Sequence, residues 1–208
     1  MPERNGASIY EKDADGTGDE RAVFSAPGNF SEPSWAADGS VLLITVQSAT
    51  SLADVFVVAR GGTPRPLVAS PADERAARFS PDGRWIAYQS DASGRPEIYV
   101  QPYPEPGPRV LVSTRGGTAP VWARDGSELF YHEGTALMAV PVRTAPTFSV
   151  GAPTRLFDAP VVVDGTGHAA YDVAPDGRRF LMILPRPANR ISVVIGFDEE
   201  LKAKVPAR

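Results

Sequence analysis

Four Asp-Gly pairs, spaced almost evenly along the chain, constrain its fold more than any other feature. Their aspartates are Asp38, Asp82, Asp125 and Asp176, at intervals of 44, 43 and 51 residues. An apolar or aromatic residue lies three positions before each aspartate, and a segment of alternating apolar residues follows each glycine. A self-similar period of roughly 40–45 residues with strand-type alternation is typical of β-propeller blades. The sequence therefore predicts an all-β fold built from repeated antiparallel sheets.

Each Asp-Gly pair suits a tight hairpin between two strands. Glycine reaches positive φ without steric cost, and aspartate tolerates the left-handed conformation. Four strands, here called a to d, are expected in each blade, with the Asp-Gly turn between a and b. In the second repeat they are expected near residues 75–80, 84–90, 97–103 and 109–114. Strand b is apolar on both faces there, as expected for a blade that lies between two neighbours.

The repeat predicts one propeller domain over residues 1–208, with four four-stranded antiparallel blades. The start of the chain matches only strands c and d of a blade, and its end reads as a short helix. The expected segments are an N-terminal c–d hairpin at about 7–26, blades at about 30–70, 71–114, 115–158 and 165–196, and a C-terminal helix at about 197–204.

The N-terminal hairpin is compatible with two arrangements of the blades. Residues 21–25 could pair beside residues 191–195 and close a four-bladed ring, or the hairpin could belong to a further blade in an open arc. We favour the incomplete, open propeller, because a closing strand would not need a strand c of its own. The first and last blades would then expose apolar groups, among them Phe24, Phe180 or Met182, which predicts self-association.

Composition and charge exclude several classes of protein. The net charge is −4 with both signs interspersed, so the basic stripe of a nucleic-acid binder is absent. There are no cysteines, which excludes disulfides and thiolate metal sites. No segment approaches the roughly 20 apolar residues of a membrane span, and the polar start MPERNGASIYEKD is not a secretory signal. A β-rich protein with no membrane span in this chain is expected.

The second repeat and its three weaker copies carry a family resemblance. FSPDGRWIAYQSDASGRPEIYVQPYP resembles the TolB-like (WD-like) propeller repeat of bacteria. VWARDGSELFYHEGTALMAVPVRTAPTFSVGAPTRLF and the closing YDVAPDGRRFLMILP, with its ISVVIGFDEELK, resemble the C-terminal blades of propellers fused to bacterial serine/threonine protein kinases. The resemblance covers about residues 9–201. It implies a β-propeller used for protein or ligand contact, usually on the extracytoplasmic side. The kinase half is absent here, and there are fewer blades than is usual in the family.

Candidate binding residues are expected on the longer loops, because binding residues concentrate on loops held by a rigid scaffold. Chain reversal places the short Asp-Gly turns on one face of the disc and the d–a and b–c connections on the other. The second face carries the loops at residues 28–32, 69–74, 90–95, 115–118 and 161–168. The candidates near the central opening are Glu32, Glu74, Arg78, Arg115, His168 and Asp172.

No metal, cofactor or catalytic group is expected. Residues 13–24 mimic a calcium loop, but Phe24 stands where a bidentate glutamate is required, so a solvated hairpin turn is the better interpretation. A zinc or general-base role needs converging partners, and His132 and His168 are the only imidazoles. The chain has no G-x-S-x-G elbow, Walker A sequence or kinase catalytic-loop motif.

Aromatic and acidic repeats also have structural explanations. Trp35, Phe79 and Trp122 share one strand position and are expected to fill the space between adjacent blades rather than to form a ligand cage. The four turn aspartates are explained by turn geometry rather than by an acidic ring.

Two functions are compatible with the sequence, because a propeller hosts many unrelated functions. The leading hypothesis is a non-catalytic scaffold that binds a protein or peptide, as the sensor or interaction part of a bacterial signalling protein. The alternative is the propeller lobe of a larger enzyme, either a prolyl-oligopeptidase-type peptidase or a propeller lyase. A neighbouring hydrolase domain with a G-x-S-x-G motif would favour the enzyme, and a kinase domain followed by a membrane span would favour the signalling protein.

Overall fold

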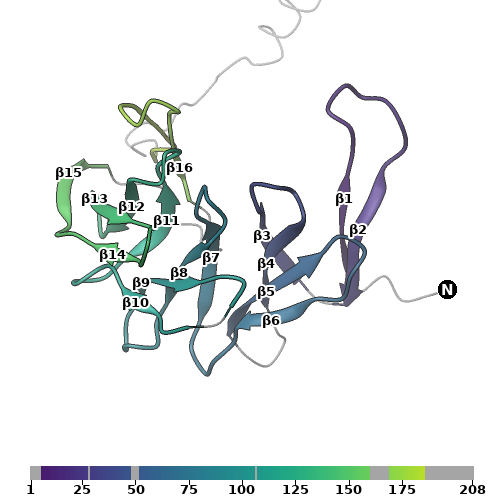
Figure 1. The fold of residues 1–208 in the computed structure, drawn as a ribbon, viewed down its shortest axis with the longest axis horizontal. Coiled ribbons are helices and arrows are strands. Elements are labelled where there is room, and N and C mark those ends of the chain that lie inside the picture. The colour runs from purple at the N-terminus through teal and green to yellow at the C-terminus, as the bar shows by residue number, and fades with distance from the viewer. Residues whose placement is uncertain (1–5, 28, 48–51, 106, 160–168, 186–208) are drawn as a thin grey trace, which may run out of the picture.

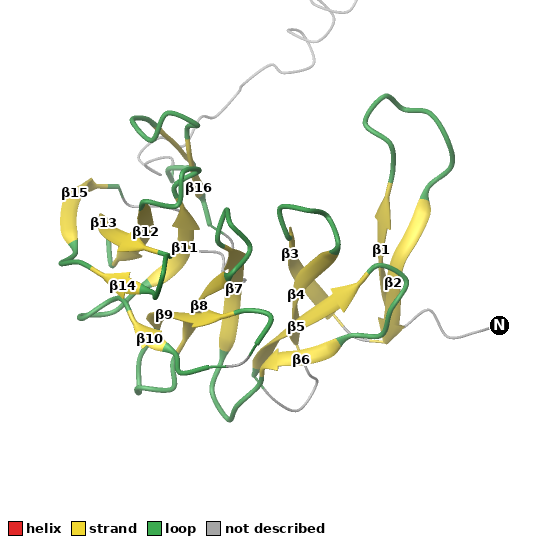
Figure 2. Cartoon of the chain, viewed as in Figure 1, coloured by secondary structure: helices red, strands yellow, loops and turns green. Residues whose placement is uncertain are grey.

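Every element of the described structure is a β-strand (Figure 1, Figure 2). The computed structural model describes residues 6–27, 29–47, 52–105, 107–159 and 169–185. Its strands form separate antiparallel sheets that follow one another along the chain. Figure 1 shows these sheets side by side in chain order, from the purple hairpin to the yellow-green end. The predicted all-β propeller architecture is confirmed.

Blades one and two each contain four strands that pair in chain order. Blade one consists of β3 (Asn29–Trp35), β4 (Val41–Gln47), β5 (Ala53–Ala59) and β6 (Arg65–Val68). Blade two consists of β7 (Glu74–Phe79), β8 (Trp85–Ser90), β9 (Glu97–Pro102) and β10 (Val110–Leu111). The strands therefore follow the a-b-c-d order that the repeat predicts.

The Asp-Gly turns have the geometry expected of their residues. In blade one, Gly39 has a φ of 67°, and Asp38 Oδ1 accepts hydrogen bonds from the backbone N–H and the hydroxyl of Ser40, at 3.0 and 2.7 Å. The carboxylates of Asp82, Asp125 and Asp176 each accept a hydrogen bond from the backbone N–H two residues on. These aspartates therefore stabilise the turns.

Blade three has one strand more than predicted. It consists of β11 (Thr118–Trp122), β12 (Glu128–Glu133), β13 (Ala136–Arg143), β14 (Ser149–Val150) and β15 (Thr154–Asp158). Both β14 and β15 pair with β13. This is possible because β13 is eight residues long, and its end at Val142 and Arg143 extends beyond the part that β15 covers.

Blade four is described only by its first hairpin. This hairpin consists of β16 (Tyr171–Val173) and β17 (Phe180–Met182). The expected strand at residues 191–195 and the expected helix at 197–204 lie outside the described residues. Within the described part of the chain, no strand of this hairpin pairs with the N-terminal hairpin, so the described sheets form an open arc.

The N-terminal hairpin packs against blade one. It consists of β1 (Gly6–Glu11) and β2 (Arg21–Pro27). Val23 and Phe24 of β2 join an apolar cluster with residues of β4 and β5, and the Phe24 ring meets the Phe30 ring edge-on, with centroids 5.0 Å apart. The expectation that Phe24 is exposed is therefore wrong, because β4 and β5 cover it.

Strand b of each blade directs alternate side chains to its two neighbours, because side chains alternate along a strand. In β8, Ile86 and Tyr88 pack in the cluster shared with blade one, and Ala87 packs in the cluster shared with blade three. In β12, Phe130 packs against blade four. Leu43 of β4 faces blade two in the same way. Apolar packing between blades therefore holds the arc together.

The last strand keeps this alternation but has no described neighbour beyond it. Phe180 and Met182 pack, partly buried, in the cluster with blade three, whereas Leu181 is 76 % exposed. The residues equivalent to Leu181 in blades one to three are at most 1 % exposed. The expectation that Phe180 and Met182 form the exposed edge is therefore wrong, and Leu181 forms it instead.

The aromatic position three residues before the Asp-Gly turn faces the preceding blade in blades two and three. Phe79 and Trp122 are buried in the clusters that join blades one to two and two to three. Trp35 is 41 % exposed, and the guanidinium of Arg60 lies over its ring, 6.0 Å from the centroid. The inter-blade position is confirmed for Phe79 and Trp122 and is wrong for Trp35, because the described β1–β2 hairpin packs on β4 and β5 and does not cover the indole.

Candidate functional site

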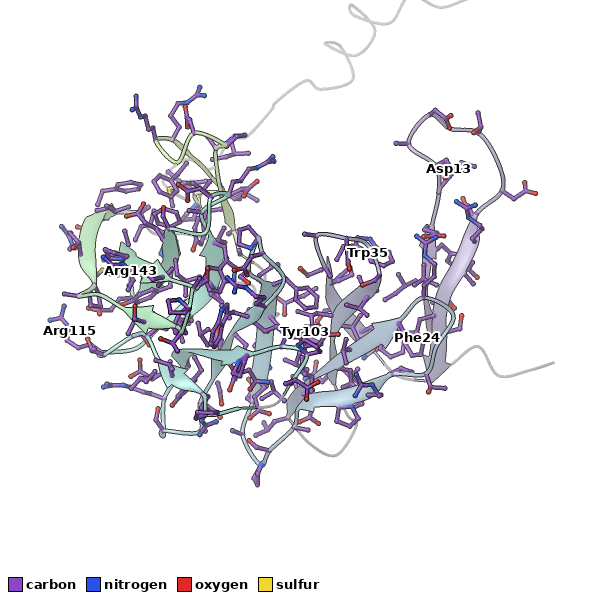
Figure 3. The ribbon with its side chains drawn as sticks, viewed as in Figure 1. Asp13, Phe24, Trp35, Tyr103, Arg115 and Arg143 are labelled. Atoms are coloured by element: carbon purple, nitrogen blue, oxygen red, sulfur yellow. The ribbon has the colours of Figure 1, made fainter. Side chains whose placement is uncertain are left out.

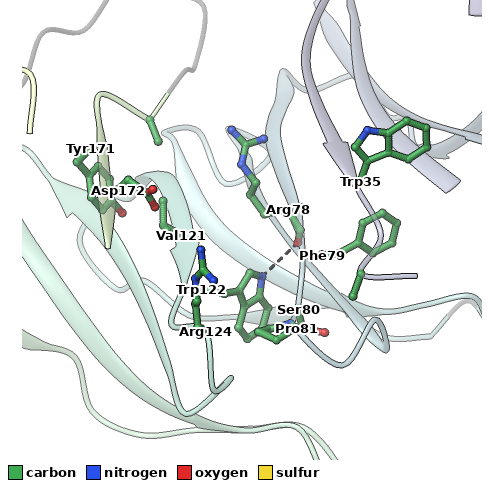
Figure 4. Close-up of a pocket in the computed structure, with 12 residues that line it drawn as sticks. Trp35, Arg78, Phe79, Ser80, Pro81, Val121, Trp122, Arg124, Tyr171 and Asp172 are labelled. Carbon is green, nitrogen blue, oxygen red and sulfur yellow. Dashed lines mark hydrogen bonds between the residues drawn. The ribbon is translucent and has the colours of Figure 1, made fainter. Parts of the chain in front are cut away.

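The inner strands of four blades line a cavity of about 460 Å³ (Figure 4). Its walls come from β3, β7, β11 and β16 and from the residues that flank these strands. Aromatic rings and charged side chains both face it. Those used below are Trp35, Arg78, Trp122, Arg124, Tyr171 and Asp172.

A bulge in three of the inner strands, β3, β7 and β11, positions the cavity-facing side chains of those strands. Glu32, Ala76 and Ala119 have φ values of 58°, 57° and 54°, and each lies within the unpaired segment where the register of its strand shifts. A bulge increases the local twist and re-aims the side chains that follow it. Arg78 and Val121 are the first paired residues after the bulges in β7 and β11, and both line the cavity.

Glu32 stabilises this arrangement rather than facing a ligand. It is 3 % exposed, and its Oε2 atom accepts hydrogen bonds from the backbone N–H of Ala76 at 2.7 Å and from the Thr45 hydroxyl at 3.0 Å. Its carboxylate thus connects blade one to the bulge of blade two. A non-glycine residue at positive φ costs about 1–3 kcal/mol and persists only where its surroundings hold it.

Two further hydrogen bonds join inner strands of neighbouring blades. The indole N–H of Trp122 donates to the carbonyl of Arg78 at 3.2 Å, as the dashed line in Figure 4 shows. The hydroxyl of Tyr171 donates to the carbonyl of Ala119 at 2.9 Å. Burial raises the pKa of Tyr171 well above its ordinary value, so this hydroxyl stays protonated. The walls of the cavity are therefore tied together across blades two, three and four.

Three charged side chains lie along the cavity. Arg78 is half-buried, and its Nη1 atom donates to the carbonyl of Ala77 at 3.1 Å. Arg124 and Asp172 are exposed, and Asp172 Oδ1 accepts a hydrogen bond from the backbone N–H of Val173 at 2.8 Å. Neither arginine forms an ion pair with any described residue. The cavity thus carries two cations and one anion in a chain whose net charge is −4.

The remaining candidates from the sequence are placed elsewhere. Glu74 is fully buried and accepts hydrogen bonds from Ser70 and from the Ser90 hydroxyl, so it orders the loop before β7. Arg115 forms an ion pair with Glu133 at 2.9 Å, and Figure 3 shows it at the periphery, away from Trp35. His168 lies outside the described residues. The cavity therefore brings together Arg78 and Asp172 of the six candidates.

Sequence reasoning missed Arg124 and Trp35 as cavity residues. Arg124 immediately precedes the third Asp-Gly pair, where the other repeats carry Ala37, Pro81 and Pro175. The charge at this repeat position, which is uncharged in the other three repeats, was the signal by which the sequence could have revealed Arg124. The shared strand position predicts Trp35 in the space between blades, whereas the structure places it, 41 % exposed, on the wall of the cavity.

Two ionisable groups outside the cavity, the buried Glu97 and the exposed Asp82, have structural partners. Glu97 accepts hydrogen bonds from the Ser113 hydroxyl, from Arg95 Nε at 2.6 Å and from the backbone N–H of Gly116. Burial alone would raise the pKa of Glu97, but these hydrogen bonds outweigh it, and the net shift is downward. For Asp82, hydrogen bonds from Ser80 and Arg84 likewise outweigh burial and lower the pKa to about 2.

His132 lies in the interface between blades three and four. It is 2 % exposed, and its ring meets the Tyr171 ring edge-on, with centroids 5.0 Å apart. Burial lowers its pKa below the ordinary value of a histidine. Among the described residues, no three acidic, histidine or cysteine side chains are grouped so that they could hold a metal ion.

Comparison with known proteins identifies the family. The model of the TolB β-propeller domain matches residues 3–150. The chain belongs to the TolB β-propeller domain family. The match runs from the N-terminal hairpin through blades one and two and into blade three.

Solved structures show the same fold in longer proteins. TolB from Acinetobacter baumannii is 19 % identical, with a TM-score of 0.58 over 83 % of this chain and 47 % of that chain. An oligogalacturonate lyase in complex with manganese is 15 % identical, with a TM-score of 0.57 over 80 % of this chain and 48 % of that chain. This TolB-family chain thus spans about half the length of either structure. Its described part contains no helix with the length and apolar character of a membrane span.

Proposed function

We propose that this TolB-family propeller is a non-catalytic scaffold that binds a protein or peptide at the central cavity. The observation that carries the proposal is a cavity of about 460 Å³ lined by inner strands of four different blades. Ligand sites are typically concave, about 300–1,000 Å³ in volume, and combine apolar walls with a few placed polar groups. A space of this size accepts a few side chains of an extended segment.

The lining of the cavity supports recognition of a peptide. Trp35 presents a partly exposed aromatic surface, and Arg78 and Asp172 present charges of opposite sign. Tryptophan and arginine are enriched among the residues that dominate binding energy at protein interfaces. The hydrogen bonds between blades hold these side chains on a rigid frame, which lowers the entropic cost of binding.

Selection of random dodecapeptides by phage display on the purified chain tests this function. Enrichment of peptides that share a sequence pattern, followed by saturable binding of the synthetic peptides, is the expected result. Hydrolase, lyase or kinase turnover that co-purifies with the chain through every step would contradict a non-catalytic role.

We also infer from the resemblance to kinase-fused propellers that this chain is the sensor or interaction part of a bacterial signalling protein on the extracytoplasmic side. The motifs of the second, third and fourth repeats support this placement. The reading frame on either side of residues 1–208 tests it. A kinase domain and a membrane span are the expected neighbours, whereas a hydrolase domain with a G-x-S-x-G motif would favour the propeller lobe of an enzyme.

We further infer that a second copy of the chain covers the exposed edges of the arc. Leu181 and Ile183 are 76 % and 63 % exposed at one end, and Tyr10 is 57 % exposed at the other. Sedimentation velocity over a range of concentrations tests this. Concentration-dependent dimers that Leu181→Lys abolishes are expected. Dimers that persist in this variant but are lost in Leu111→Lys, on the outer strand of blade two, would contradict the edge contact.

A further inference from the structure

The arginines of the cavity have donors that the described protein groups leave available. A guanidinium carries five N–H donors, and Arg78 uses one of them, toward the carbonyl of Ala77. The backbone of Arg78 is itself held by the indole of Trp122. Arg124 forms no hydrogen bond or ion pair with the described residues and reaches the same cavity from the turn after β11. Both side chains can therefore engage a ligand.

The nearby carboxylates do not neutralise these two cations. Asp82 is bound by Ser80 and by Arg84, whose Nη2 atom lies 2.8 Å from Asp82 Oδ2. Asp172 lines the cavity but forms an ion pair with neither arginine. In Figure 4, the side chains of Arg78, Arg124 and Asp172 stand along the cavity between Tyr171 and Trp35. The cavity therefore keeps an excess of one positive charge.

The walls strengthen the attraction for an anion. Trp122 and Tyr171 are buried to more than nine-tenths of their surface, and Trp35 offers an apolar platform beside the charges. A cleft with low-dielectric walls focuses the field of the charges that line it. Guanidinium groups match carboxylates in shape and form short, charge-assisted hydrogen bonds with them.

We propose that Arg78 and Arg124 bind a carboxylate of the peptide ligand, next to an apolar side chain that packs on Trp35. This inference rests on the proposed function and names the chemistry of its ligand. Asp172 repels a second carboxylate, so the site prefers a single acidic group to an acidic run. The carboxylate comes from an aspartate or glutamate side chain or from a free C-terminus.

Three fluorescein-labelled peptides distinguish these sources by fluorescence anisotropy. The first is Gly-Phe-Glu-Phe-Gly with a C-terminal amide, the second replaces its Glu by Gln, and the third is the Gln peptide with a free C-terminal carboxylate. The Glu peptide is expected to bind at least tenfold more tightly than the Gln amide, since each 1.4 kcal/mol is a factor of ten. Tighter binding of the third peptide instead would assign the site to a C-terminus.

Substitutions connect the effect to the two arginines. Arg78→Gln and Arg124→Gln are each expected to lower the affinity for the Glu peptide about tenfold and to leave the affinity for the Gln amide unchanged. Arg143→Gln is the matched control. Arg143 is exposed and lies outside the cavity, and its substitution by glutamine removes the same charge. Asp172→Asn is expected to raise the affinity for the Glu peptide. A purely structural role of these residues would not produce this gain. If Arg78→Gln unfolds, Arg78→Lys replaces it in the titration, because lysine keeps the charge.

Each outcome separates this inference from the proposed function. If all three peptides bind equally, or if Arg143→Gln weakens binding as much as Arg124→Gln, carboxylate recognition is wrong while peptide binding stands. If no peptide binds at millimolar concentration, this inference is overturned; if the peptides from phage display also fail to bind, peptide binding is overturned as well.

Discussion

At the scale of single residues, buried polar groups connect the blades of this propeller. Glu32 illustrates this, because one carboxylate oxygen accepts hydrogen bonds from the backbone of blade two and from a hydroxyl of its own blade. Ala76, whose N–H it accepts, has positive φ and is 2 % exposed. A buried N–H that loses its partner costs about 1–3 kcal/mol.

Glu32→Ala is therefore expected to lower the free energy of unfolding by about 1–3 kcal/mol, because it leaves the N–H of Ala76 buried without its carboxylate. Urea denaturation followed by circular dichroism measures the change. Glu105→Ala is the control, because Glu105 is exposed. Equal unfolding midpoints for the two variants would mean that the Glu32 contact does not stabilise the arc.

His132 makes the stability depend on pH. Its pKa is lowered by burial in the folded state, so between that value and the ordinary value of about 6.5 the unfolded chain binds more protons. Stability is therefore full above pH 6.5 and declines as the pH falls below it. The thermal midpoint of the wild type should drop between pH 7 and pH 5 more than that of His132→Gln, which carries the residue found at the equivalent position, Gln89. If the thermal midpoints of the two proteins change equally with pH, His132 is not the group that makes the stability depend on pH.

At the scale of elements, the alternation of strand b explains which residues lie between blades. Phe180 of β17 packs against blade three, with its ring edge-on to Phe130 at 5.0 Å between centroids, whereas Leu181 points the other way. Phe180→Ala should cost about 2–4 kcal/mol in the free energy of unfolding, and Leu181→Ala less than about 0.5. Urea midpoints of the two variants measure this difference, and a larger loss for Leu181→Ala would show that the register of β17 is shifted by one residue.

The periodic part of this pattern could be read from the sequence, and the part that depends on neighbours could not. The Asp-Gly spacing and the alternation predict the strands and the packing of Phe79 and Trp122. The exposure of Trp35 depends on how the N-terminal hairpin packs against blade one, which no local pattern reports. The extra strand β14 (Ser149–Val150) pairs through two residues only, too few for a period.

The candidate site was only partly predictable for a similar reason. Arg78 and Asp172 were identified as charged residues near the expected opening. Glu32 and Glu74 are also charged residues near the expected opening, yet buried hydrogen bonds hold both within the scaffold. Arg78 enters the cavity directly after the bulge that re-aims β7, and bulges have no clear signature in this sequence.

At the scale of the whole molecule, the described sheets form an open arc whose inner strands carry the cavity. This chain spans about half the length of the TolB and oligogalacturonate lyase structures that share its fold. The arc presents Trp35 at one end of the cavity and the charges of blades two to four along it. Binding at this position therefore needs several blades to be assembled at once.

The most direct test of the central claim is an anisotropy titration of the peptides from phage display with a variant that fills the cavity. Val121 lies on the cavity wall, half-buried, so Val121→Trp should occupy the space and abolish binding. Leu156→Trp adds the same ring on the outer strand β15, at an exposed position, and should leave binding unchanged. Thermal midpoints confirm that both variants are folded. Full-strength binding by folded Val121→Trp would contradict the claim that the central cavity is the binding site.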